Sequence, residues 1–502
     1  MEHISLSVPS PNSTFPTSFQ MSNGDEELNS RLVSLLPKEE EEHSLSTRIC
    51  AESKKLWMVA GPAILTRFAV VGVLISTQAF LGHVGSLELA GYALSFTVID
   101  RFAVSILLGM ASALETLCGQ AFGAKQYHML GVYLQRSWIM LFACVILLIP
   151  VFIFATPLLE LLGQDKAIAK EAGIICLWFI PVIFSHIFNF TFQMYLQSQS
   201  KNMVISYFSV FSFMFHLFLS WLMVIKFSWG LHGAMTAMCI SMWFPVIGQF
   251  IYVLCGGCPE TWKGFSWSAF SDLGLVAKLS LSSGLMICLE LWYNSILILL
   301  TGNMENAEVE LDALSICLNL SGWGMMIFVG LLAAAGVRVA NELGAGNANA
   351  TRFAIVNVVS TSAIIGVVLF VLFLVFRRSI AFIFTDSEPV LEAVADLSPL
   401  LAFTILLQSI QPVLSGVAVG AGLQKMVAYV NIACYYLVGV PLGIIFGYVI
   451  GYQIKGLWVG MLVGTLIQTL VLCYITWKLD WDKQVELARE RVNKWFLPES
   501  PE

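Results

Sequence analysis

The apolar segment 279–301 contains one carboxylate, Glu290, in the run Ile287-Cys288-Leu289-Glu290-Leu291-Trp292-Tyr293-Asn294. Water cannot solvate a carboxylate in the core of a bilayer, so such a group must be paired, protonated or open to a cavity. A carboxyl group there can accept a proton in one state of the protein and release it in another. We therefore predict that Glu290 carries protons. The alternative is a hydrogen bond between helices that never titrates.

Polar side chains at helical spacing strengthen this hypothesis. Asn294 follows Glu290 by one turn, so the two residues share a helix face, and Tyr293 is adjacent. Other apolar segments hold amide and phenol groups that we expect to support Glu290 or to contact a substrate: Asn319, Gln408, Gln411, Asn431, Tyr435 and Tyr436. Each amide alone is equally suited to joining two helices.

A second set of charges lies in the first part of the chain, where Arg67, Asp100 and Arg101 fall inside apolar segments. Adjacent residues on a helix point about 100° apart, so Asp100 and Arg101 cannot face one partner together. We expect Asp100 to form a buried ion pair across helices, with Arg101 or Arg67, or to line a cavity. A second proton site is the alternative for Asp100.

The composition identifies the solvent of these segments as lipid. Of 502 residues, 58% are hydrophobic and 12% are charged, whereas a soluble protein has about 25% charged residues. The net charge of −7 argues against a nucleic-acid partner. Eleven scattered cysteines and isolated histidines form no metal-ligand pattern, so we expect neither a metal nor another cofactor.

About twenty apolar residues cross a bilayer as a helix, and the chain contains twelve such segments. We place these spans at 57–80, 88–113, 133–155, 170–198, 203–225, 231–255, 279–301, 309–335, 354–376, 390–421, 427–450 and 456–477. The fold class is therefore an all-α polytopic membrane protein.

The tails carry most of the Lys and Arg residues on their side of the membrane, which predicts that both termini are cytosolic. Residues 1–55 are rich in Ser, Pro and Glu, so we expect a disordered tail. In the tail 478–502 we predict a short amphipathic helix over 480–496. Its apolar face would contain Trp481, Val485, Ala488, Val492 and Trp495.

The two halves of the chain repeat one another. Gly109 to Ala124, GMASALETLCGQAFGA, aligns with Gly330 to Ala345, GLLAAAGVRVANELGA, and each follows the second span of a six-span unit. Six is even, so both units insert in the same direction. We predict a first lobe over 56–255, a cytosolic linker over 256–278 and a second lobe over 279–477.

These motifs, together with the run Leu414-Ser-Gly-Val-Ala418, resemble the plant branch of the multidrug and toxic compound extrusion (MATE) transporters over about residues 50–480. The resemblance implies two six-helix lobes, alternating access and antiport, with a proton gradient favoured over a sodium gradient. It also implies small organic substrates, such as flavonoids, other secondary metabolites and xenobiotics, and a vacuolar or plasma membrane location. Family members commonly have a carboxylate at the position of Glu290. Many also have an Asp near the position of Gln408. The glutamine of this chain cannot titrate.

Within the motifs, Glu115, Arg338 and Glu342 lie at predicted cytosolic helix ends. An Arg that bridges to acids of another helix and releases them during transport would form a gate, whereas fixed links between loops are the alternative.

Two other functions compete with an antiporter. A lipid or oligosaccharide flippase would need a strongly cationic cavity, but only Arg67 and Arg101 are basic within the spans. A membrane-embedded enzyme would need convergent His, Asp, Glu or Ser clusters, which the spans lack. We expect a monomeric transporter rather than an enzyme, with protons, a small organic substrate and the lipid bilayer as its partners.

Overall fold

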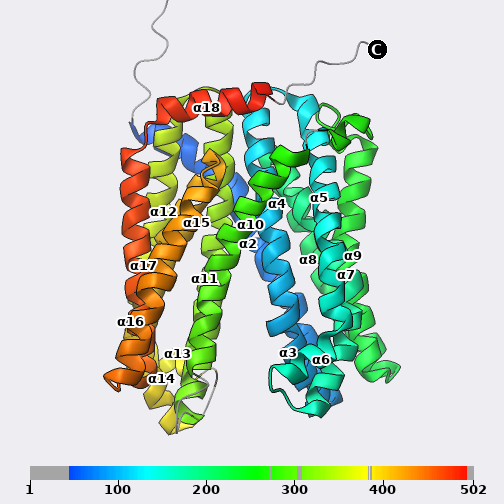
Figure 1. Cartoon of the computed structure of the whole chain (residues 1–502), viewed down its shortest axis with the longest axis vertical. Helices are drawn as coiled ribbons and strands as arrows, with labels where there is room; N and C mark the ends of the chain where they lie inside the picture. Colours follow the sequence, from blue (N-terminus) through cyan, green and yellow to red (C-terminus); the bar gives the residue numbers. More distant parts are fainter. Residues whose placement is uncertain (1–44, 272, 302–307, 383, 385–386, 495–502) are drawn as a thin grey trace, which may run out of the picture. The chain divides into compact units, whose positions relative to one another are not determined.

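The computed structural model describes residues 45–494, apart from 272, 302–307, 383 and 385–386. The chain divides into two units, residues 1–50 and residues 51–502. The first unit contributes only the helical residues 45–50 to the described part. The second unit is a set of helices in which the described residues include no strand (Figure 1).

The helices of the first half follow the predicted spans closely, and several have π-helical ends. They are α2 (Leu45–Val84), α3 (Ser86–Leu94), η1 (Ser95–Asp100), α4 (Arg101–Gly123), α5 (Tyr127–Ile153), α6 (Ala155–Leu161), α7 (Lys166–Ser198), α8 (Asn202–Ser220), η2 (Trp221–Lys226), α9 (Gly230–Tyr252) and η3 (Val253–Gly257). The short η4 (Trp267–Phe270) then precedes the second half.

The second half repeats this pattern and ends in an additional helix. Its elements are α10 (Leu273–Thr301), α11 (Glu308–Gly344), α12 (Ala348–Val375), α13 (Arg377–Ala381), α14 (Glu388–Ala421), α15 (Gln424–Asn431), η5 (Ile432–Gly439), α16 (Val440–Ile444), η6 (Ile445–Val449), α17 (Gln453–Lys478) and α18 (Trp481–Lys494). Among the described residues, eleven helices are long and apolar enough to cross a membrane. The helix α10 covers the predicted seventh span.

One predicted boundary is wrong. Residues 45–55 are helical rather than disordered, since α2 begins at Leu45. Hydropathy locates the part of a helix that lipid surrounds, but a helix can continue into water with exposed charged residues such as Lys54 and Lys55.

Two hydrophobic cores correspond to the two lobes. The first joins buried residues between Val73 and Val276, and the second joins residues between Ala313 and Ala421 with α17 and α18. The beginning of the first span belongs to the second core, because Leu56, Val59 and Ala60 are buried there. The helix α2 therefore links both lobes.

The repeated motifs face one another where the lobes meet. A Cβ atom on Gly119 would touch Ala340, which is the equivalent residue of the other copy. A Cβ atom on Gly123 would collide with the carbonyl of Asn341, and one on Gly344 with the carbonyl of Gln120. These two contacts are reciprocal at the offset of the repeat, so α4 and α11 are related by an approximate twofold axis.

Candidate functional site

The predicted proton carrier, Glu290, lies on α10 and is linked to α14. Gln411 Nε2 donates a hydrogen bond to Glu290 Oε1 at 3.0 Å, and the same nitrogen lies 3.2 Å from Ser415 Oγ. Gln411 is buried, whereas Glu290 is half-buried. An amide donor can serve a carboxylate or the carbonyl oxygen of a neutral carboxyl group, so this pair suits both protonation states of Glu290.

Two further polar side chains donate hydrogen bonds to the backbone of α10 beside Glu290, and a third supports one of these two. Tyr436 donates to the carbonyl of Leu289 at 2.9 Å, and Asn431 Nδ2 donates to the carbonyl of Met286 at 3.3 Å. Gln468 Nε2 donates to Asn431 Oδ1 at 3.1 Å. The π-helical turns of η5 place Tyr436 against α10, and such turns occur often at functional sites.

Tyr293 and Tyr435 form a stacked pair next to this group. Their ring centroids are 4.2 Å apart with an interplanar angle of 10°, and both residues are buried. The Tyr293 hydroxyl donates to the carbonyl of Met461 at 2.7 Å. These contacts join α10, η5 and α17, so the pair positions the helix that carries Glu290.

The other predicted neighbours of Glu290 differ in placement. Gln408 accepts a hydrogen bond from Ser321 Oγ at 3.1 Å, which links α11 to α14. Asn319 is exposed and donates to the carbonyl of Ser315, one turn earlier on its own helix. The side chain of Asn294 lies outside the described part of the structure.

Of the two predicted partners of Asp100, the charge of Arg101 interacts with the Asp100 carboxylate. Asp100 is 4% exposed at the end of η1, and its Oδ1 has no hydrogen-bond partner in the described part of the chain. Arg101 is exposed, with its guanidinium 5.7 Å from the centroid of the Phe96 ring. The charge of Arg67 instead interacts with that of Glu115.

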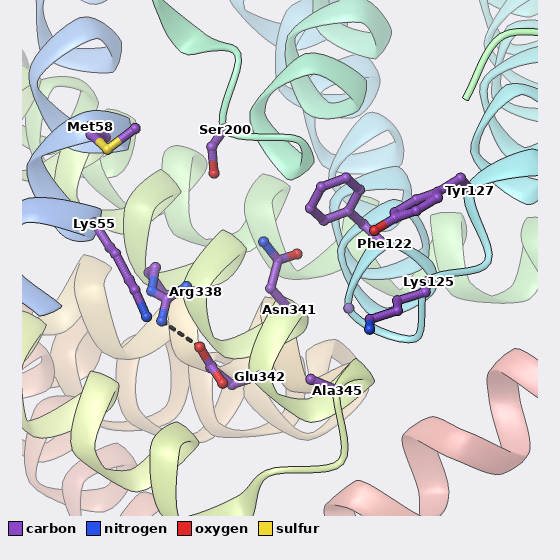
Figure 2. A pocket seen from close by; sticks show the side chains of 11 residues that line it. Lys55, Met58, Phe122, Lys125, Tyr127, Ser200, Arg338, Asn341, Glu342 and Ala345 are labelled. Carbon is purple, nitrogen blue, oxygen red and sulfur yellow. Dashed lines mark hydrogen bonds and ion pairs between the residues drawn. The ribbon is translucent and has the colours of Figure 1, made fainter. Parts of the chain in front are cut away.

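Two of the three predicted gate residues, Arg338 and Glu342, belong to an ion-pair group at one end of the lobes. Arg338 on α11 bridges to α2 through two bonds with Glu52, at 2.7 and 3.1 Å. Arg338 Nη2 also lies 2.5 Å from Glu342 Oε1 (Figure 2). Glu115 is buried beside Gly336 on the opposite helix and is not part of this ion-pair group. Arg338 therefore connects helices, as a gate residue must.

Sequence reasoning missed two residues that matter here. It assigned Glu52 to a disordered tail, and it did not consider Ser415. Glu52 lies one turn before Leu56, so a charged residue at the helical spacing of the apolar face was the available signal. Ser415 lies in the run Leu414-Ser-Gly-Val-Ala418 that carries the family resemblance, but that run did not single it out, because serine is common in membrane helices as a packing residue.

Comparison with known proteins is consistent with this organisation. The MatE family model matches twice, at residues 62–222 and 283–445. Protein DETOXIFICATION 21 of Arabidopsis thaliana is 57% identical over 463 residues, which are 92% of this chain and 94% of that protein. Protein DETOXIFICATION 20 of the same plant is 56% identical over 475 residues, or 94% of this chain and 97% of that one.

Solved structures of MATE transporters have a similar fold. The eukaryotic MATE transporter AtDTX14 is 34% identical, with a TM-score of 0.84 over 88% of this chain and 99% of its own. The Vibrio cholerae MATE transporter VcmN in its bent form is 16% identical and shares the fold, with a TM-score of 0.73 over 90% of this chain and all of its own. The chain is thus an integral membrane protein with the twelve-helix, two-lobe fold, and it belongs to the MATE family of transporters, which export toxic compounds by antiport.

Proposed function

We propose that this chain is a proton-coupled antiporter in which Glu290 carries the proton. The observation that carries the proposal is the contact between Glu290 on α10 and Gln411 on α14 in the second lobe. It places a half-buried carboxyl group between two helices of one lobe, among amide and phenol groups that hold it in position.

The coupling follows from charge. A protonated Glu290 is neutral, so the lobes reorient without moving a bare carboxylate through a low dielectric. On the side where protons are scarce, the carboxyl group releases its proton and the substrate binds. On the other side a proton returns to Glu290 and the substrate leaves, so that the proton and the substrate occupy the site in turn. Each pH unit of gradient provides about 1.4 kcal/mol per proton, and about 100 mV of membrane potential provides about 2.3 kcal/mol.

The substrates in this proposal are small organic compounds, such as flavonoids, other secondary metabolites and xenobiotics. The names of the Arabidopsis relatives support detoxification as the role. Both termini face the cytosol, and the membrane is that of the vacuole or the plasma membrane. The excess of basic residues in the tails supports this orientation.

The test is uptake of a labelled flavonoid into proteoliposomes under an imposed pH step. Glu290→Gln keeps the shape of the side chain and removes the titrating group, so we expect it to abolish gradient-driven uptake while the protein still inserts. Glu392→Gln is the matched control, because Glu392 is an exposed carboxylate near the beginning of α14. Normal uptake by Glu290→Gln, with an unchanged pH dependence, would reject the proposal.

A further inference from the structure

Two adjoining pockets lie where the lobes meet, at the end of the molecule where α4 and α11 finish. Their volumes are about 350 and 500 Å³. They share Gly123, Lys125 and Ala345 as lining residues, and α18 forms one wall of the larger pocket. Together they form a groove, which we call the seam groove.

Four cationic side chains line the seam groove, namely Lys55, Lys125, Arg338 and Arg489, against a single lining carboxylate, Glu342. Arg338 uses Nε and Nη2 for Glu52 and Glu342, and Lys55 lies 3.8 Å from Glu52. Lys125 and Arg489 form no ion pair with any described residue. The seam groove therefore has uncompensated positive charge.

Lys125 occupies a costly backbone position. Its φ of 60° lies in the left-handed region, where a non-glycine residue costs on the order of 1–3 kcal/mol. The equivalent residue in the other copy of the repeat is Gly346, with a φ of 80°. The chain thus has a lysine at a position where the other copy of its repeat has the glycine that adopts this conformation without strain.

The remaining walls suit a phosphorylated organic molecule. Tyr127 and Ser200 supply hydroxyl groups to the smaller pocket, and Met58 and Phe122 supply apolar surface (Figure 2). Phosphate oxygens accept hydrogen bonds from amines, guanidinium groups and hydroxyls. Basic pockets between membrane helices on the cytoplasmic side are sites for phosphoinositide headgroups.

We propose that the seam groove binds a phosphate-bearing anion. Lys55 and Lys125 come from the first half of the chain and Arg338 from the second, so the bound anion holds the lobes together at this end. The seam groove opens to the cytosol if both termini are cytosolic, which is part of the proposed function. The binding chemistry does not depend on Glu290.

Binding is measured on the purified full-length chain, without a gradient or a substrate. One arm uses nanodiscs of phosphatidylcholine with and without a phosphatidylinositol phosphate, with thermal unfolding as the readout. The other arm titrates inositol bisphosphate, the water-soluble headgroup, by calorimetry. Stabilisation by the lipid alone identifies a membrane lipid as the source, and binding of the free headgroup identifies a soluble phosphate as sufficient. No effect of either probe would overturn the proposal.

Charge variants locate the site. Lys125→Gln and Arg489→Gln are each expected to weaken binding about fivefold, as expected for the loss of one cation near an anionic phosphate. Lys54→Gln is the matched control, since Lys54 is exposed next to Lys55 and does not line the groove. Equal losses in Lys54→Gln and Lys125→Gln would contradict the proposal. Glu290→Gln is expected to bind normally, so failure of binding and failure of proton coupling are separable.

Discussion

At the scale of single residues, the site depends on an amide that keeps a carboxyl group in place. Gln411 directs its amide nitrogen to Glu290 and Ser415 from a buried position on α14. Many members of the family have a titratable Asp near Gln408. This chain has amides on α14 instead, so Glu290 is the only acid among the described contacts of this group.

We predict that Gln411→Ala slows transport by about tenfold or more at normal expression. A hydrogen bond to a charged group contributes about 1.5–3 kcal/mol, and its loss also frees the Glu290 side chain to leave its position. Gln408→Ala is the comparison, because Gln408 bonds to Ser321 and not to Glu290. Initial uptake rates in proteoliposomes provide the measurement. A larger loss in Gln408→Ala than in Gln411→Ala would mean that Gln408 is the functional amide.

The placement of Glu290 in an apolar helix could be predicted from the sequence, because an acid in an apolar segment stands out, and its role as proton carrier stays a prediction. The choice between Gln408 and Gln411 could not. The two residues are three positions apart on one helix, and only the packing of α14 against α10 and α11 decides which of them meets Glu290. The partner of Asn319 could not be predicted either, since its amide donates to the carbonyl of Ser315 on its own helix and its side chain is exposed.

At the scale of elements, α18 lies across the ends of the helices and contacts α4, α11 and α12 (Figure 1). Trp481 and Ala488 are buried in the core of the second lobe, which agrees with the predicted amphipathic face. Trp495, the last predicted residue of that face, lies outside the described residues. The sequence could indicate that an amphipathic helix forms, but not that it reaches the first lobe.

That contact is made by Arg491, whose Nη1 donates to Gln120 Oε1 on α4 at 2.7 Å. The guanidinium lies over Gly422, where a side chain would collide with it, and burial lowers the pKa of Arg491. Gln120 Nε2 in turn donates to the carbonyl of Gly420 at 3.0 Å. The helix α18 therefore connects both lobes through one half-buried cation.

We expect Arg491→Ala and Gln120→Ala each to lower the thermal unfolding midpoint, with a coupling between them of about 1.5–3 kcal/mol because the pair is one charged hydrogen bond. Thermal unfolding of the single and double variants in detergent measures the coupling. Lys483→Ala, an exposed position on α18, is the control. Additive effects of the two substitutions would show that the bond contributes nothing of its own.

At the scale of the whole molecule, the duplication explains the seam between the lobes. The same family model matches twice, and equivalent residues of the two copies meet at Gly119 and Ala340. The repeat and its parallel orientation could be predicted from the sequence. The packing of residues 56–60 in the core of the second lobe could not be predicted, because hydropathy does not show which helix an apolar face will pack against.

A matched pair of glycine substitutions tests this contact. Gly119→Ala adds a methyl group against Ala340, and overpacking of this kind costs about 1–3 kcal/mol. Gly61→Ala adds the same group where nothing lies within 4 Å, so it should stabilise α2 by about 0.5–1 kcal/mol. We expect the unfolding midpoints to move in opposite directions. A stabilised Gly119→Ala variant would contradict the close approach of α4 and α11.

Proton release on substrate binding is the measurement that tests the account most directly. The purified protein is mixed with a flavonoid substrate in weakly buffered detergent solution, and a pH indicator reports the protons. We predict release by the wild-type chain and by Glu392→Gln, and none by Glu290→Gln, although that variant still binds the substrate. Equal release by Glu290→Gln and the wild-type chain would contradict the central claim that Glu290 exchanges its proton for the substrate.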